Sequence, residues 1–137
     1  MITQKYLDDL TYEIIGAAIE VQKTVGRGLL EKVYQECMIE EMKHRKINFS
    51  SELAVPLMYK NKSLQTDFRC DFLVEDCLVV EIKSVNEMNT IYEAQLLTYM
   101  KLLKMPKGLL LNFNCMNIFK HGQKTMINDY FRNLPKK

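Results

Sequence analysis

Two short apolar runs on either side of an acidic turn constrain the fold of this chain more than any other feature. They form the segment D-F-L-V-E-D-C-L-V-V-E-I-K at residues 71–83, with Glu75-Asp76 between them. Short apolar runs bounded by turn residues are typical of buried strands, so we expect an antiparallel hairpin with Asp71 at the start of its first strand and Glu81 near the end of its second. Because side chains alternate faces along a strand, Glu81 and Lys83 should project together.

The register of this hairpin decides whether the two acidic residues meet. Residues paired across antiparallel strands share a face of the sheet. Pairing of Asp71 with Glu81 requires an odd number of loop residues. A two-residue loop at Glu75-Asp76 would instead pair Asp71 with Val80 and separate the carboxylates, unless a bulge restored the phase.

Two convergent carboxylates beside an ammonium have the chemistry of a metal-dependent phosphodiesterase. The carboxylates of Asp71 and Glu81 and the backbone carbonyl of Ile82 are hard oxygen ligands suited to Mg²⁺, which lowers the pKa of a bound water. Lys83 would orient or deprotonate that water, or stabilise the transition state. The alternative for E-I-K is a surface cross-strand ion pair, although the apolar run before it makes uncompensated charge expensive.

The rest of the chain alternates between helical and strand periodicity. We expect helices over residues 8–25, 29–46 and 87–104. We expect strands over 53–59, 64–74, 77–85 and 108–113, and then an edge strand or hairpin formed by 117–119 and 124–127. The first three strands form an antiparallel meander, and a helical crossover sets the fourth parallel to the third. The predicted fold class is α/β, a mixed sheet packed against helices in one domain over residues 1–137.

The composition excludes several classes of protein. The 137 residues are 47% hydrophobic and 26% charged, as in an ordinary globular domain. No stretch reaches the roughly 20 apolar residues of a membrane span, and the first residues lack a secretory pattern, so we expect a cytoplasmic protein with no membrane partner. The four cysteines include no C-x-x-C pair, which favours buried free thiols over a zinc site or disulfides.

The charge is unevenly distributed along the chain. Residues 1–99 carry 11 Lys and Arg against 16 Asp and Glu, whereas residues 100–137 carry 8 against 1. The basic C-terminal third is either an electrostatic footprint for a phosphate backbone or a solvated surface. Within it, the candidates for phosphate contact are Lys101, Lys120 and Lys124.

Three polar residues on the predicted helices are further candidates. Glu31 opens the second helix, where an acidic residue complements the helix dipole. Gln95 and Tyr99 are four residues apart and so share one face of the third helix. A partly exposed amide is the alternative for Gln95. His44 and His121 lack metal-ligand spacing.

Six motifs spread over nearly the whole chain carry a family resemblance. They are I-I-G-A-A-I-E-V at 14–21, V-G-R-G-L-L-E-K-V-Y at 25–34, R-C-D-F-L-V-E-D at 69–76, V-V-E-I-K-S-V at 79–85, A-Q-L-L-T-Y at 94–99 and G-L-L-L-N-F at 108–113. Together they resemble the GxxExxY proteins, a bacterial and archaeal group in the PD-(D/E)xK nuclease superfamily. The Q-L-L-T-Y segment is also similar to the Q-x-x-x-Y motif of RecB-type nucleases.

The resemblance implies a restriction-endonuclease-like core of helices, a three-stranded antiparallel meander, a crossover helix and a parallel strand. It implies that Asp71 and Glu81 bind Mg²⁺ or Mn²⁺, that Lys83 is the catalytic lysine and that Glu31 is a further acid near the metal. Gln95 would orient water or substrate. By the same resemblance, Tyr99 would support its helix or touch a phosphate, and Tyr34 would serve in packing.

The chain departs from the family pattern at three points. Gln22 stands where family members commonly carry a histidine, and Cys70 stands where the proline that names the superfamily would precede Asp71. The cysteines do not follow the spacing with which some RecB-type relatives bind an iron-sulfur cluster, so we predict no cluster.

We therefore expect a metal-dependent nuclease that hydrolyses DNA phosphodiester bonds through metal-activated water. Two alternatives are a nucleic-acid-binding module that does not cleave and a protein-interaction domain that retains the fold. A core of this size has little room to surround DNA, which leaves a homodimer or a partner protein open as a means of gripping the substrate. The sequence also leaves open whether the substrate is DNA or RNA and whether the enzyme is an endonuclease or an exonuclease.

Overall fold

The computed structural model describes residues 1–137 and contains a five-stranded mixed sheet. The strands, in the order in which they are hydrogen-bonded, are β1 (Phe49–Ala54), β4 (Arg69–Val74), β5 (Leu78–Lys83), β6 (Lys107–Asn112) and β7 (Gln123–Ile127). β5 and β6 run parallel, and the other neighbouring strands run antiparallel. The predicted α/β class, with a mixed sheet and one parallel pair, is confirmed.

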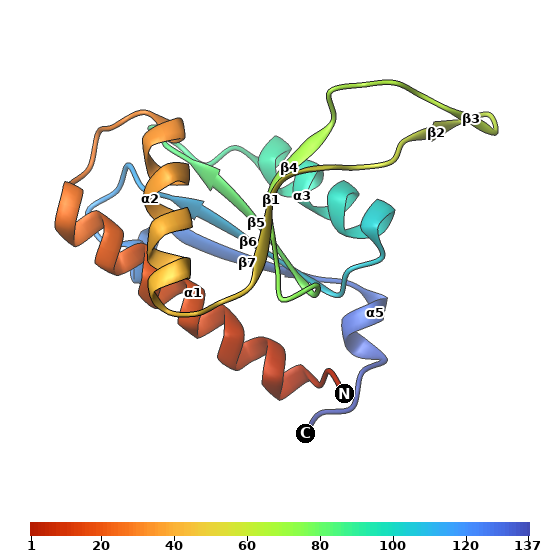
Figure 1. Cartoon of the computed structure of the whole chain (residues 1–137), viewed down its shortest axis with the longest axis horizontal. Coiled ribbons are helices and arrows are strands. Elements are labelled where there is room, and N and C mark those ends of the chain that lie inside the picture. Colours follow the sequence, from red (N-terminus) through yellow and green to blue (C-terminus); the bar gives the residue numbers. More distant parts are fainter.

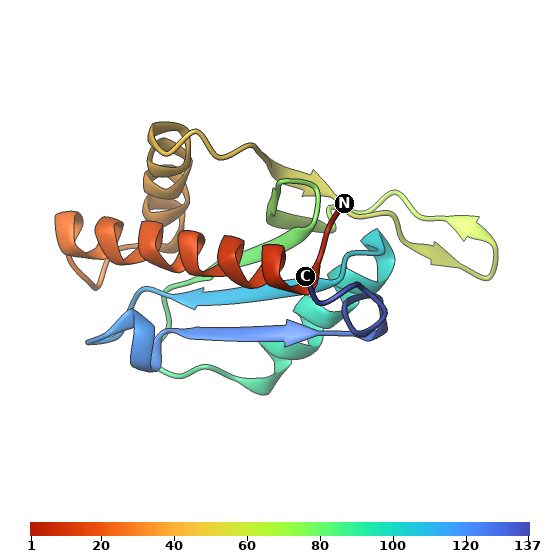
Figure 2. The same ribbon diagram turned by 90° about the horizontal axis from the view of Figure 1, so that it is seen from below.

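Helices cover both faces of the sheet (Figure 2). The two N-terminal helices, α1 (Gln4–Val25) and α2 (Glu31–His44), pack on one face, and the crossover helix α3 (Thr90–Leu103) packs on the other. Two short helices, α4 (Ile118–His121) and α5 (Asp129–Arg132), flank β7. None of the helices is both long and apolar enough to cross a membrane.

The apolar core has two parts, one on each side of the sheet. The larger part joins α1 and α2 to the sheet, and the smaller part joins α3 to it. Gly108 shows how closely α3 approaches β6, because a Cβ at this position would lie 2.7 Å from Met100 Sδ and 2.8 Å from Leu96 Cγ. This close packing fixes α3 against the central strands that carry the acidic residues.

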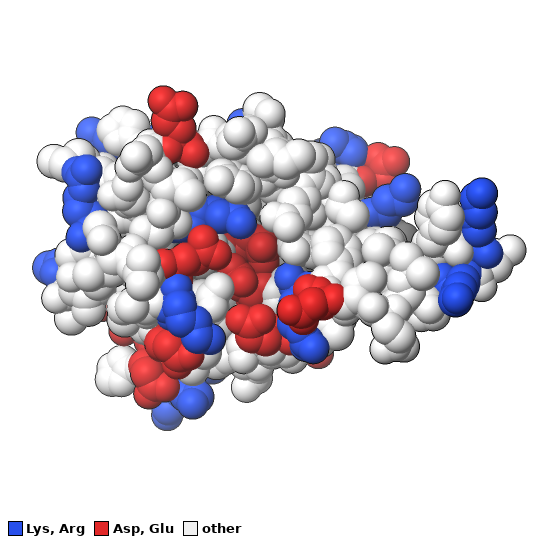
Figure 3. Space-filling model, turned by 90° about the horizontal axis from the view of Figure 1, so that it is seen from above, with Lys and Arg blue, Asp and Glu red and all other residues white.

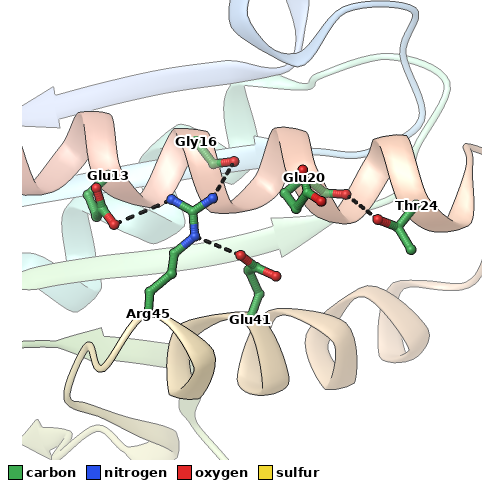
Figure 4. A network of polar contacts seen from close by, with 6 residues as sticks. All are labelled: Glu13, Gly16, Glu20, Thr24, Glu41 and Arg45. Carbon is green, nitrogen blue, oxygen red and sulfur yellow. Dashed lines mark hydrogen bonds and ion pairs between the residues drawn. The ribbon is translucent and has the colours of Figure 1, made fainter.

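Arg45, which directly follows α2, ties that helix to α1 (Figure 4). Its Nε donates to Glu41 Oε2 at 2.7 Å, its Nη1 lies 3.3 Å from Glu13 Oε1, and its Nη2 donates to the carbonyl of Gly16 at 3.4 Å. Hydrogen bonds from a guanidinium to carboxylates are stronger than those between neutral groups. They help to hold the position of α2, which begins at Glu31.

The expected meander differs from the observed one in its first two strands. β1 ends at Ala54, and residues 55–68 leave the sheet as a long hairpin, with β2 (Met58–Tyr59) paired to β3 (Lys62–Ser63) near its tip (Figure 1). The predicted strand over 53–59 is therefore wrong in its bounds. Pro56 has no N–H to donate to a ladder, and the residues beyond it are mostly exposed, so neither pairing nor burial continues the strand.

The C-terminal expectation is also corrected in part. Residues 118–121 form helix α4 rather than a strand, because the side chain of Asn117 caps the helix by accepting a hydrogen bond from Lys120 N–H. The edge strand expected at 124–127 is present as β7, and the short helix α5 after it was not predicted. The strand expected over 64–74 begins only at Arg69, five residues later, because residues 64–68 belong to the long hairpin outside the sheet. The three long helices and the remaining strands match the expected ones with ends shifted by at most four residues.

Candidate active site

The hairpin of β4 and β5 has the register that brings the two acidic residues together. Val74 pairs with Leu78, which leaves three loop residues, Glu75, Asp76 and Cys77. Glu75 and Asp76 have φ angles of 50° and 55°, and Cys77 N–H donates to the carbonyl of Val74 at 3.0 Å. The tight turn at Glu75-Asp76 thus carries one extra residue, Cys77, and this odd loop length sets the phase.

Asp71 and Glu81 lie opposite each other at the open end of this hairpin. The paired residues of β4 and β5 end at Phe72 and Val80. Beyond them, Asp71 N–H donates to Glu81 Oε2 at 2.6 Å and Ile82 N–H donates to Asp71 Oδ2 at 2.7 Å. Each carboxylate thus accepts a backbone hydrogen bond from the facing strand, which holds the two side chains next to each other.

Helix α2 contributes two polar residues to the neighbourhood of this pair. Gln35 Nε2 donates to Asp71 Oδ1 at 2.9 Å. The charge of Glu31 helps to raise the pKa of both Asp71 and Glu81. The structure contains no group of three or more His, Cys, Asp or Glu side chains arranged to hold a metal ion. Glu31 therefore lies near the pair without completing a three-carboxylate ligand set.

The loop before Glu31 is anchored by hydrogen bonds to two hydroxyl groups. The Tyr34 hydroxyl donates to the carbonyl of Gly26 at 2.7 Å and accepts from Leu29 N–H at 3.2 Å. Ser84, directly after β5, donates its hydroxyl to the carbonyl of Leu29 at 2.6 Å. Buried Tyr34 therefore acts in packing and loop support, and the loop is tied to the strand that carries Glu81.

Burial and mutual repulsion perturb both carboxylates. Glu81 is only 4% exposed, and burial, followed by the charge of Asp71, raises its pKa to about 8. Burial likewise raises the pKa of Asp71 to about 6, although its hydrogen bond from Ile82 N–H and the charge of Lys83 oppose the rise. Lys83 thus offsets only part of the cost of placing two acids together.

Lys83 is held beside an aromatic ring of α3. Its Nζ lies 4.6 Å from the ring centroid of Tyr92, within the range of a cation–π contact. The lysine is half-buried, and its charge acts on both carboxylates. Strand alternation therefore places Lys83 with Glu81, as the E-I-K spacing predicted.

Helix α3 also borders the acidic pair through Tyr99. Burial, and then the negative charges of Glu81 and Asp71, raise the pKa of Tyr99 to about 12. Gln95 is half-buried one turn earlier on the same face of α3. The same surroundings raise the pKa of the buried Cys70 thiol to about 12, with burial as the main cause. All four cysteines are free.

The three candidate phosphate-binding lysines lie on different elements. Lys124 on β7 pairs with Leu110 on β6, and Leu110 pairs with Glu81 on β5. Lys124 therefore lies in the same row of the sheet as Glu81, two strands away. Its Nζ lies 3.6 Å from Glu93 Oε1. Lys101 on α3 and Lys120 on α4 are exposed. The basic residues of the C-terminal third are thus spread over several elements.

The surroundings of the site are acidic. The charges of Glu31 and Glu52 both act on Asp71, against the single opposing charge of Lys83. Figure 3 shows acidic side chains gathered around a central hollow of one face, with basic side chains at its margin and at the far end of the molecule. Such a surface attracts cations and repels a polyanion until cations neutralise it.

Sequence reasoning missed three residues that contact the site or its supports. Gln35, which binds Asp71, lies four residues after Glu31, and this helical spacing was a usable signal. Tyr92 and Ser84 gave no comparable signal, because their contacts with Lys83 and the loop before α2 join segments that the sequence does not show to be adjacent.

The fold is restriction-endonuclease-like. It has a mixed sheet with helices on both faces, and its central hairpin carries a buried acidic pair with a lysine at the open end. The chain belongs to the PD-(D/E)XK nuclease superfamily, whose family model matches residues 8–126. Members of this superfamily are generally nucleases that use divalent metal ions. No curated protein and no solved structure gives a significant match. The superfamily prediction is confirmed, and the assignment to the GxxExxY group stays a prediction.

Proposed function

We propose that this protein is a divalent-metal-dependent nuclease that hydrolyses DNA phosphodiester bonds at a site formed by Asp71, Glu81 and Lys83. The observation that carries the proposal is the pair of hydrogen bonds by which the two carboxylates bind each other's strand in a buried position. Burying two like charges is costly, and perturbed acidic groups of this kind cluster at functional sites. Superfamily membership supports nuclease chemistry.

The donor set of the site fits a hard divalent cation. No hydrogen bond is made to Glu81 Oε1, and no buried side-chain oxygen in the structure lacks a partner, so this atom is within reach of solvent. The oxygens of Asp71 accept one hydrogen bond each and retain a lone pair. With the Ile82 carbonyl and with Glu31 nearby, these oxygens are ligands that Mg²⁺ and Mn²⁺ prefer. When bound, such an ion supplies a water of lowered pKa and offsets charge on the phosphate.

The remaining residues have roles that follow from their positions. The Lys83 ammonium, held over Tyr92, orients the attacking water and stabilises charge that develops on the phosphate. Tyr99 is protonated at neutral pH, as an ordinary tyrosine is, and its raised pKa extends this to higher pH, so its hydroxyl can donate a hydrogen bond to a phosphate oxygen. Gln95, on the same face, orients water or substrate through its amide.

The GxxExxY assignment agrees with the supports found around α2. Gly28 has a φ angle of +87°, which favours glycine. Glu31 lies near the acidic pair, and the Tyr34 hydroxyl holds the loop before α2. In place of the common histidine, Gln22 donates through Nε2 to the carbonyls of Phe113 and Cys115, which is a structural role.

The test is cleavage of labelled single- and double-stranded DNA and RNA with Mg²⁺, with Mn²⁺ and with EDTA. We expect DNA cleavage only with a divalent ion, and a loss of about 100-fold or more in Lys83→Ala. Lys43→Ala removes an exposed lysine of α2 and should match the wild type. Wild-type cleavage by Lys83→Ala would refute the assigned site. DNA binding without products would favour a non-cleaving module, and absence of salt-dependent DNA binding would favour a protein-interaction domain.

A further inference from the structure

A hairpin arm, residues 55–68, projects from the body of the protein (Figure 1). At its base, Val55 N–H donates to the carbonyl of Phe68 at 2.8 Å, and farther out Leu64 N–H donates to the carbonyl of Leu57 at 2.9 Å. Beyond these bonds, β2 and β3 pair over only two residues each. An isolated two-stranded hairpin is marginally stable, so packing within the chain gives little reason for this projection.

The charge of the arm is opposite to that of the nearby site. Lys60 and Lys62 stand at the tip, and the one acidic residue of the arm, Asp67, lies at its base, where Arg69 Nε is 2.8 Å from its Oδ1. Figure 3 shows basic side chains at this far end of the molecule, separated from the acidic hollow. The arm is therefore a cationic extension beside a site that by itself repels a polyanion.

The tip also exposes apolar surface between its charges. Tyr59 is 61% exposed and Met58 is 57% exposed. Lys60 Nζ lies 5.5 Å from the ring centroid of Tyr59, so the amine and the ring face the same region of solvent. An exposed aromatic ring among lysines is the combination by which proteins bind nucleic-acid strands, through phosphate contacts and base stacking.

The arm starts close to the acidic pair. It returns to the sheet at Arg69, two residues before Asp71 in the same strand. Extended backbone advances about 3.3 Å per residue, so the tip can lie up to about 30 Å from Asp71. That span corresponds to roughly 9 steps of DNA at about 3.4 Å each. A DNA strand of that length that runs from the site along the arm would reach the tip.

We propose that residues 55–68 form a DNA-binding arm, in which Lys60 and Lys62 contact backbone phosphates flanking the site and Tyr59 stacks on an unpaired base. The choice of DNA as the occupant rests on the proposed nuclease function. The arm supplies the positive charge that the acidic hollow lacks, and the domain thereby grips a substrate longer than its own core.

The test is binding of fluorescein-labelled DNA to the full chain in EDTA, measured by anisotropy over a range of salt concentrations. Each lost phosphate contact lowers the slope of log K against log salt by about 0.9. The double variant Lys60→Ala/Lys62→Ala should therefore lose about 1.8 of slope on duplex DNA and about 60-fold in affinity near 0.1 M salt. Tyr59→Ala should weaken single-stranded binding about 5-fold or more at nearly unchanged slope.

A matched control separates the arm from general charge. Lys23→Ala/Lys43→Ala removes the same charge from exposed positions near the ends of α1 and α2, away from the arm, and should bind like the wild type. Thermal unfolding midpoints equal to that of the wild type show that the variants fold. An equal loss in the control, an unchanged slope in the arm variant, or wild-type binding to RNA but not DNA would each overturn the proposal.

The binding assay also keeps this proposal distinct from the proposed function. Binding in EDTA needs no turnover, so arm-dependent DNA binding by a protein that never cleaves would sustain the arm and refute the nuclease. Metal-dependent cleavage by the wild type, with unchanged DNA binding by Lys60→Ala/Lys62→Ala, would sustain the nuclease and refute the arm.

Discussion

Removing one negative charge from the acidic pair should stabilise the metal-free protein. Burial and the charge of Asp71 raise the pKa of Glu81 from an ordinary value of 4.5 to about 8. Glutamine has nearly the same shape, and its amide oxygen can still accept the hydrogen bond from Asp71 N–H that Glu81 accepts now. Glu81→Gln therefore removes the charge and keeps the contact.

The effect has a definite sign and a magnitude that depends on pH. In the unfolded chain Glu81 releases its proton near pH 4.5, and in the folded protein near pH 8. Between these values the folded state holds more protons, so wild-type stability falls as the pH rises through this window. At about 1.36 kcal/mol per pH unit, the cost at pH 7 is about 3 kcal/mol. Solvent at Oε1 screens part of this cost, so we expect Glu81→Gln to stabilise the protein by about 1 to 3 kcal/mol.

The assay is urea unfolding of wild type and Glu81→Gln in EDTA, followed by circular dichroism at pH 5, 7 and 9. The gain should be below about 1 kcal/mol at pH 5 and largest above pH 8. Glu20→Gln, at an exposed position of α1, should stay within about 0.5 kcal/mol of wild type at every pH. A destabilised Glu81→Gln at pH 7, or a gain that does not grow with pH, would refute the reasoning.

Three further outcomes follow from the same contacts. Addition of Mg²⁺ at 10 to 100 times its Kd should stabilise the wild type by about 1.4 to 2.7 kcal/mol and Glu81→Gln much less, as followed by Tm; an equal rise in both proteins would exclude Glu81 as a ligand. Tyr34→Phe removes both hydrogen bonds to the loop before α2 and should cost about 1 to 2 kcal/mol in urea unfolding, whereas an unchanged midpoint would show that the loop is held without them. Gly122→Ala would place a Cβ 2.6 Å from a backbone carbonyl oxygen and from the Cys115 thiol, so we expect a loss of about 1 to 3 kcal/mol; a neutral substitution would mean that the C-terminal turn relaxes freely.

The order of elements was predictable where local signals agree. The helix expected over 87–104 is α3, Thr90–Leu103, and the strand expected over 108–113 is β6, Lys107–Asn112. In both places apolar periodicity coincides with flanking Pro106 and Gly108. The arm was not predictable in this way. Its residues have the pattern of a strand, and they leave the body of the protein only because no strand of the five-stranded sheet pairs with them.

The candidate site shows the same division between local and non-local information. The spacing of Glu81 and Lys83 along one strand places both on one face without any knowledge of the fold. The meeting of Asp71 with Glu81 depends on Cys77, the single extra residue that sets the hairpin phase, and composition does not distinguish this loop from a two-residue turn. Gln35 reaches Asp71 only because α2 packs at this end of the sheet.

Charge counts were the weakest guide because they ignore where the chain goes. Of the basic C-terminal third, Lys107 is buried in an ion pair with Asp8, and the charge of exposed Lys124 is partly offset by Glu93 at 3.6 Å. A nuclease site must hold carboxylates for metal and still attract phosphates, and these demands conflict at close range. Placing the lysines on an arm separates them from the acidic pair. Metal affinity and DNA affinity should then respond to different substitutions, and this independence is what the two sets of variants measure.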